Sequence, residues 1–186
     1  MKSSSPRIQK TSQVPAREWA WNFIPTVICA VLLLAGCSTP VAQTVSFNEA
    51  DYKSYESVGG AVIHGHAFVR SDTGVKHGAA GVNIYLVPLT AYTEERAKIM
   101  ESGKEPAAAD PRLENYIKTT VGDWGGDYKF EGLPAGKYLL YCKIDWERQY
   151  PNSMRRAGSG EVYAVARAQV SGGEHKSVVI TNPGRN

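Results

Sequence analysis

The stretch spanning residues 121–144 limits the fold more than any other part of the chain, because it reads as two strands joined by a tight turn. Residues 123–127, DWGGD, favour a turn, since the glycines tolerate positive φ and the aspartates can bond their own backbone. Alternating apolar and polar residues over 128–133 predict a half-buried strand. A glycine and proline turn at 132–136 and an apolar run at 138–144 complete a predicted hairpin, and therefore an antiparallel sheet.

This stretch resembles the signature of carboxypeptidase regulatory-like domains, which are seven-stranded, transthyretin-like β-sandwiches. Residues 126–138, GDYKFEGLPAGKY, fit the pattern G-x-Y-x-F-x-x-L-P-x-G-x-Y. The family's opening strand is matched by IHGHA at 63–67, its second by GVNIYL at 81–86, and its last by residues 170–180. The resemblance covers residues 59–181 and implies an all-β, Greek-key sandwich.

We accordingly assign residues 59–182 to the sandwich domain and 183–186 to a loose C-terminus. Outside the central stretch, strands are predicted at 59–69, 81–88, 115–121, 161–170 and 175–181, and a polar loop at 71–80. A short helical insertion interrupts this pattern from Thr90 to Tyr116. Thr90 is a predicted N-cap, Gly103 a predicted helix end, and Asp110-Pro111 a predicted start of one further turn. The insertion is either a site of specificity or a cover for a sheet edge.

The N-terminus has the pattern of an export signal. Four basic residues precede an apolar run of about a dozen residues, 24–36, which is short for a membrane span and typical of a signal-peptide core. The run ends in Leu34-Ala35-Gly36-Cys37, which resembles the lipobox of bacterial lipoproteins. The resemblance implies that residues 1–36 are removed and that Cys37 is acylated. The polar composition of the segment that follows predicts that residues 37–58 form a lipidated N-terminus and tether, part of which can lie against the domain. An ordinary cleaved signal and an uncleaved membrane anchor are the alternatives.

The same resemblance implies where the chain resides. The resemblance implies three acyl chains at Cys37, and stable anchoring needs more than one. Acylation would therefore hold the protein in the bilayer of the cell envelope. Ser38, rather than an aspartate, favours the outer membrane, on its periplasmic side, in a Gram-negative cell.

Charge and cysteine content limit the possible functions. The chain has 21 Lys and Arg against 18 Asp and Glu, but four of the basic residues and one acid lie in the leader, which leaves 17 against 17. A neutral mature chain gives no electrostatic case for nucleic acid. Cys142 is the one cysteine left after Cys29 and Cys37, so no internal disulfide is expected. Its place in an apolar strand favours a buried hydrophobe over a reactive thiol.

Two groups of residues are candidates for binding. The first combines aromatic and arginine side chains, which protein interfaces and sugar sites both use, and comprises Tyr92, Trp146, Arg148, Tyr150, Arg155 and Arg156. The second is the pair His64 and His66, whose alternate strand positions could present two imidazoles to a metal ion. We treat this pair as a weak metal candidate, because no spacing in the sequence supplies a third ligand, and we favour the simpler interpretation of a solvated strand face.

No catalytic motif accompanies these residues: the chain has no G-x-S-x-G, H-E-x-x-H or Walker pattern and no cysteine pairs for zinc. We therefore expect no enzyme and no cofactor. The leading hypothesis is a lipid-anchored sandwich that binds an envelope protein or polysaccharide. The alternative is a carbohydrate- or small-ligand-binding module, and binding of a metal through His64 and His66 ranks below both.

Overall fold

The computed structural model describes residues 39–71, 74–145 and 161–182, all within one compact unit formed by residues 37–186. The predicted signal peptide, Cys37 and residues 183–186 therefore lie outside the described residues. No helix in the described part of the chain has the length and apolar character needed to cross a membrane.

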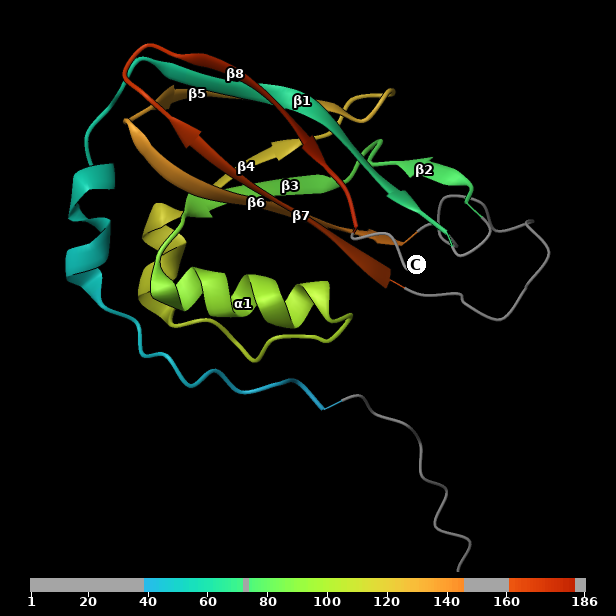
Figure 1. The fold of residues 1–186 in the computed structure, drawn as a ribbon, viewed down its shortest axis with the longest axis horizontal. Coiled ribbons are helices and arrows are strands. Elements are labelled where there is room, and N and C mark those ends of the chain that lie inside the picture. Colours follow the sequence, from blue (N-terminus) through green and yellow to red (C-terminus); the bar gives the residue numbers. More distant parts are fainter. Residues whose placement is uncertain (1–38, 72–73, 146–160, 183–186) are drawn as a thin grey trace, which may run out of the picture. The chain divides into compact units, whose positions relative to one another are not determined.

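The described elements follow one another in this order: η1 (Glu49–Tyr55), β1 (Ala61–Arg70), β2 (Lys76–Gly78), β3 (Asn83–Pro88), α1 (Ala91–Glu101), η2 (Pro111–Tyr116), β4 (Lys118–Val121), β5 (Asp127–Leu133), β6 (Gly136–Asp145), β7 (Glu161–Val170) and β8 (His175–Ile180). The strands form two sheets that pack face to face (Figure 1). In the first sheet, β1 pairs with β2, β5 and β8; the second has the order β4-β3-β6-β7. Strands β1 and β8 run parallel, and all the other strand pairs described here run antiparallel.

The predicted strand pattern is confirmed in outline. Each of the seven predicted strands has a counterpart, and one more described strand, β2, forms within the predicted loop 71–80, where it pairs with the end of β1. Strand β4 begins at Lys118 rather than at residue 115, because the residues before it complete the 3-10 helix η2. The alternation predicted for β1 also holds, since Ile63, Ala67 and Val69 are buried.

The predicted hairpin at 128–144 was wrong. Strands β5 and β6 do not pair with each other: β5 pairs with β1, and β6 with β3 and β7. The turn at residues 134–135 instead carries the chain from one sheet to the other, and the Tyr138 hydroxyl donates a hydrogen bond of 2.8 Å to the Pro134 carbonyl. The physical reason is that each strand has a face of large apolar side chains. These two faces bury against each other across the core, which side-by-side pairing would not achieve.

Between the sheets lies the main hydrophobic core. Its largest buried side chains include Ile63, Ile84, Leu86, Leu133, Leu140, Ile144 and Ile180, which come from five strands of the two sheets. This two-layer arrangement with a few helices is the all-β sandwich class expected from the sequence.

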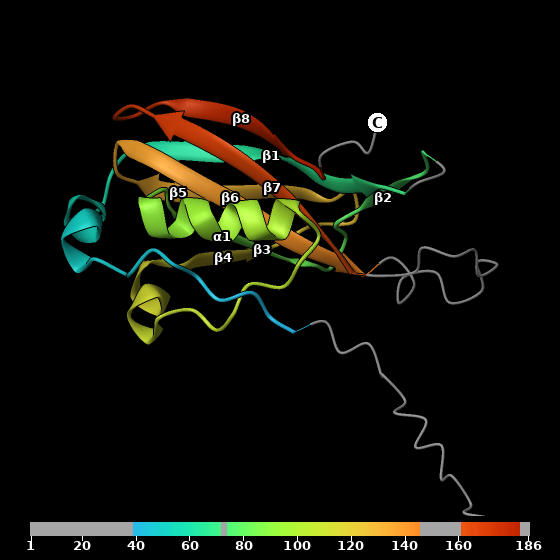
Figure 2. The same cartoon turned by 60° about the horizontal axis from the view of Figure 1, so that its bottom comes forward.

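The helical insertion forms as predicted. The Thr90 side chain caps α1 by accepting a hydrogen bond from the Thr93 backbone, and Gly103 follows the helix with a φ of 75°. Asp110 caps η2, with Pro111 in its first turn. Helix α1 lies on the outer face of the second sheet, on the side away from the first (Figures 1 and 2). Arg167 on β7 holds it there by ion pairs of 2.8 Å to Glu94 and 2.6 Å to Glu101.

The segment predicted as a tether lies against the domain. Residues 41–48, which we call the strap, run along the insertion, and Val41 forms an isolated parallel bridge with Pro106. The Glu95 carboxylate accepts hydrogen bonds from the Thr44 and Val45 backbones, at 3.0 and 2.8 Å. Tyr52 on η1 is fully buried and stacks on Phe47 with ring centroids 4.7 Å apart. A second hydrophobic cluster therefore joins the strap, η1, α1 and η2 to the outer face of the second sheet.

Cys142 lies on β6 with no exposed surface, as expected for a small buried hydrophobe. Burial raises the pKa of its thiol to about 12, so almost no thiolate exists near neutral pH. We expect the Cys142 peptide to remain unlabelled when the folded protein is treated with iodoacetamide at pH 8, and to be labelled fully in guanidinium chloride, as read by mass spectrometry. Rapid labelling of the folded protein would contradict this burial.

Candidate functional site

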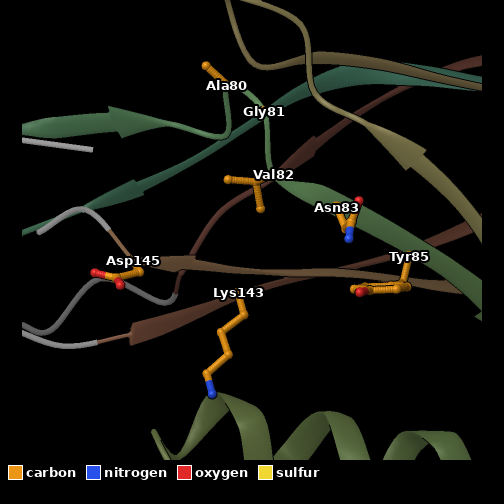
Figure 3. A pocket seen from close by; sticks show the side chains of 7 residues that line it. All are labelled: Ala80, Gly81, Val82, Asn83, Tyr85, Lys143 and Asp145. Atoms are coloured by element: carbon orange, nitrogen blue, oxygen red, sulfur yellow. The ribbon is translucent and has the colours of Figure 1, made fainter. Parts of the chain in front are cut away.

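A pocket of about 330 Å³ opens on the outer face of the second sheet, where β3 begins and β6 ends. It is lined by Ala80, Gly81, Val82, Asn83, Tyr85, Lys143 and Asp145. Figure 3 shows Lys143 extending toward α1, with Asp145 and Tyr85 on either side of it. We call the surface formed by Asn83, Tyr85, Tyr141, Lys143 and Asp145 the platform.

Strand register explains why these side chains meet. Strands β3 and β6 are antiparallel neighbours in which Tyr85 lies opposite Tyr141 and Ile84 opposite Cys142. Because successive side chains alternate between the faces of a sheet, Ile84 and Cys142 enter the core while the two tyrosines point outward. Asn83 directly precedes Ile84, and Lys143 directly follows Cys142, so both also lie on the outer face.

The aromatic part of the platform is a stacked pair. The Tyr85 and Tyr141 rings lie 5.1 Å apart between centroids, with 23° between their planes. Tyr141 is partly buried and packs with the second cluster, so it supports Tyr85 from the helix side. Tyr85 lines the pocket beside groups that can donate and accept hydrogen bonds.

The charged part of the platform is held in place by three partners of Lys143. Its ammonium group forms ion pairs with Glu105, at 2.9 Å, and with Glu161. Partial burial disfavours the charged ammonium, but these two bonds outweigh it and raise the pKa of Lys143 above its usual value. Lys143 also lies 5.4 Å from the centre of the Tyr163 ring, and the Tyr163 hydroxyl donates to Glu105 at 2.7 Å. The ammonium group of Lys143 thus stays charged, its charge is balanced by the two carboxylates, and its position is fixed.

An exposed tryptophan lies in the turn next to the pocket. Trp124, in the β4–β5 turn, has 101% relative exposure. The turn is well ordered by the Asp123 carboxylate, which accepts hydrogen bonds of 2.8 Å from the backbones of Gly125 and Asp127. The backbone of Gly122, in the same connection, is bonded to Gly81 and Val82, which line the pocket. Trp124 is therefore an exposed aromatic group in the connection that contacts two of the residues lining the pocket.

The residues singled out from the sequence are placed differently from one another. Tyr92 is only 6% exposed; its hydroxyl accepts a hydrogen bond from the Asp110 backbone at 2.8 Å, so the residue joins α1 to η2.

His64 and His66 lie on the outer face of the first sheet, where His66 contacts Asp127 at 2.9 Å. Within the described ranges, no three His, Cys, Asp or Glu side chains gather as a metal site would require.

The remaining predicted binding residues, Trp146, Arg148, Tyr150, Arg155 and Arg156, lie outside the described residues. The segment that carries them leaves the sheet at Asp145 and returns at Glu161, and both of these residues belong to or adjoin the platform. The platform itself was not predicted from the sequence. Its signal was available as tyrosines on the non-core side of three predicted strands, Tyr85, Tyr141 and Tyr163, but without the strand order nothing shows that these strands are neighbours.

Comparison with solved structures identifies the fold. The chain is similar to a Pseudomonas aeruginosa protein described as a candidate carbohydrate binding protein, with a TM-score of 0.63 and 22% sequence identity over 74% of this chain and 99% of that one. A second match, to (S)-allantoin synthase, has a TM-score of 0.35 and 13% identity over 67% and 41% of the two chains, which is too weak to carry an argument. No family model and no curated protein matches the chain.

Proposed function

We propose that this chain is a non-catalytic, lipid-anchored envelope protein that binds a carbohydrate on the platform. The observation that carries the proposal is the Tyr85–Tyr141 stack beside fixed polar groups in a pocket of about 330 Å³. A sugar ring presents apolar C–H groups on its faces and hydroxyls around its edge. An aromatic ring flanked by amide, ammonium and carboxylate groups matches both.

The charges of the platform favour a neutral sugar. Lys143 is paired with Glu105 and Glu161, so its positive charge is already balanced by two carboxylates. A phosphate or uronic acid would have to compete with these two carboxylates for Lys143, whereas neutral hydroxyls can bond to either sign of charge. The Pseudomonas protein of similar fold supports the proposal to the extent that it too is described as a candidate carbohydrate binder.

Of the two partners expected from the sequence, a polysaccharide fits this site better than a protein. A stable protein interface buries about 800 Å² on each partner and has an apolar centre. The platform is instead a small polar pocket with an aromatic floor. The envelope location rests on the resemblance of residues 34–37 to a lipobox, and replacing Cys37 with serine, followed by membrane fractionation, tests it directly.

Replacement of Tyr85 with alanine should weaken sugar binding about tenfold or more, because it removes the ring on which the sugar stacks. The measurement is a titration of the ¹⁵N-labelled domain, residues 38–186, with neutral oligosaccharides, in which amide shifts report both affinity and position. Tyr85→Phe should keep most of the affinity, since the ring remains. Trp124→Ala shows whether the exposed tryptophan takes part.

Phe68→Ala is the matched control. Phe68 is also a partly buried aromatic on an outer sheet face, but it lies on β1 of the first sheet. The proposal is wrong if neutral oligosaccharides shift no platform amides, or if Phe68→Ala and Tyr85→Ala weaken binding equally. Circular dichroism of each variant separates loss of binding from loss of fold.

A further inference from the structure

The strap is attached to the insertion at several independent points. Besides the Glu95 contacts, the Gln43 amide oxygen accepts a hydrogen bond of 2.7 Å from Arg96, and its amide nitrogen donates to the Tyr92 carbonyl at 3.2 Å. The Arg112 guanidinium lies 4.7 Å from the centre of the Phe47 ring. Such a segment is a fixed part of the domain rather than a flexible spacer, so the domain cannot move freely relative to residue 41.

The first residue of the strap lies close to the platform. The Val41 backbone donates to the Glu105 carbonyl at 2.8 Å and accepts from the Ala107 backbone at 2.8 Å. The Glu105 carboxylate in turn bonds Lys143, at 2.9 Å, and Tyr163. Glu105 therefore contacts both Val41, at the start of the strap, and Lys143 of the platform. Figure 2 shows the blue strap running beside the connection that follows α1.

Only a short length of chain joins this point to Cys37. The four peptide units from Cys37 to Val41 span at most about 14 Å when fully extended. The opposite end of the sandwich is much further away, since β6 alone carries the chain about 23 Å from Lys143 back to Gly136. An anchor at Cys37 therefore keeps the platform end within a short distance of the bilayer and sets no such limit on the opposite end.

We propose that the strap orients the domain on its own membrane, with the platform end held against the headgroup layer and the β5–β6 turn directed away. The inference rests on the acylation of Cys37 put forward as part of the proposed function. It gives the insertion a role, because α1 and the connection after it form the dock for the strap. It also limits the partner of the platform to sugars carried at the surface of the anchoring membrane.

The orientation can be measured with fluorophores in the mature, acylated chain that begins at Cys37. A bimane label is attached at Lys104→Cys, exposed beside Glu105, or at Val58→Cys, which is 91% exposed near the β5–β6 turn. The buried Cys142 should not compete for label. The protein is incorporated in phosphatidylcholine vesicles with or without a nitroxide-headgroup lipid. We expect the label at position 104 to lose most of its fluorescence and the label at position 58 to lose little.

Two variants test whether the strap causes the difference. Glu95→Ala removes the hydrogen-bond acceptor for the Thr44 and Val45 backbones. Insertion of a twelve-residue Gly/Ser linker (about 18 Å of average reach) after Ser38 lengthens the connection between Cys37 and the strap and leaves the domain unchanged. Both should reduce quenching at position 104. Glu114→Ala, which removes another exposed glutamate of the insertion, should leave it unchanged.

The outcomes separate the two proposals. If the chain does not float with the vesicles, the anchor is wrong and the orientation fails with it. If the chain floats but both labels are quenched alike, or if Glu95→Ala and the linker change nothing, the orientation is wrong while the anchor stands. Because no sugar is present, failure of carbohydrate binding on the platform leaves this measurement unaffected.

Discussion

Replacement of Tyr52 with alanine should lower the free energy of unfolding by about 3–5 kcal/mol, and the melting temperature by roughly 8–15 °C. Tyr52 has no exposed surface, and its ring lies 4.7 Å from the ring centres of both Phe47 and Tyr116. Truncation leaves a cavity where the strap, η1 and η2 meet. Chemical denaturation of residues 38–186 measures the loss, and faster hydrogen exchange of the strap would locate it.

Tyr52→Phe is the matched control for this prediction. It keeps the ring and removes only the hydroxyl, which is 2.9 Å from the Thr90 hydroxyl. The expected cost is about 1 kcal/mol, the usual net contribution of one hydrogen bond. If alanine costs no more than phenylalanine does, then the strap and η1 contribute nothing to the stability of the sandwich.

Tyr52 also shows where the sequence stopped being informative. Residues 38–58 have no apolar periodicity, and their aromatic residues, Phe47, Tyr52 and Tyr55, are scattered in a largely polar segment, which is typical of a tether. Phe47 and Tyr52 find partners because the insertion supplies Tyr92, Leu113 and Tyr116 from far along the chain. Tyr55 instead packs against Tyr138 of β6, with ring centroids 5.3 Å apart. Local patterns predicted the strands and the caps of α1 well, because those depend on neighbours in sequence.

Predicting which sheet each strand joins, and which side chains form the platform, requires knowledge of strand pairing. Strands β5 and β6 have the pattern of a hairpin, and only the competing pairings with β1, β3 and β7 separate them. The platform depends on the same pairings, since Tyr85 and Tyr141 are 56 positions apart in sequence and meet through the β3–β6 register. Pattern predicts which face a residue occupies, but not which strand lies beside it.

Replacement of Gly65 with alanine should destabilise the sandwich by at least about 3 kcal/mol, because the core has no room for a methyl group there. Gly65 lies on β1 between Tyr128 of β5 and Val178 of β8. An alanine Cβ would overlap the Val178 carbonyl oxygen, which belongs to backbone and cannot rotate away. That oxygen also accepts a 2.8 Å hydrogen bond from the Tyr128 hydroxyl, which reaches it across the glycine.

The two effects should therefore be coupled. Gly65→Ala displaces the acceptor of the Tyr128 hydroxyl, so adding Tyr128→Phe should cost less in the alanine variant than in the wild type. Gly172→Ala is the control, since no atom lies within 4 Å of its added Cβ, and its stability should change little. Equal denaturation midpoints for Gly65→Ala and Gly172→Ala would contradict the close approach of β1 and β8. Full additivity with Tyr128→Phe would show that the hydrogen bond does not depend on the space that the glycine leaves.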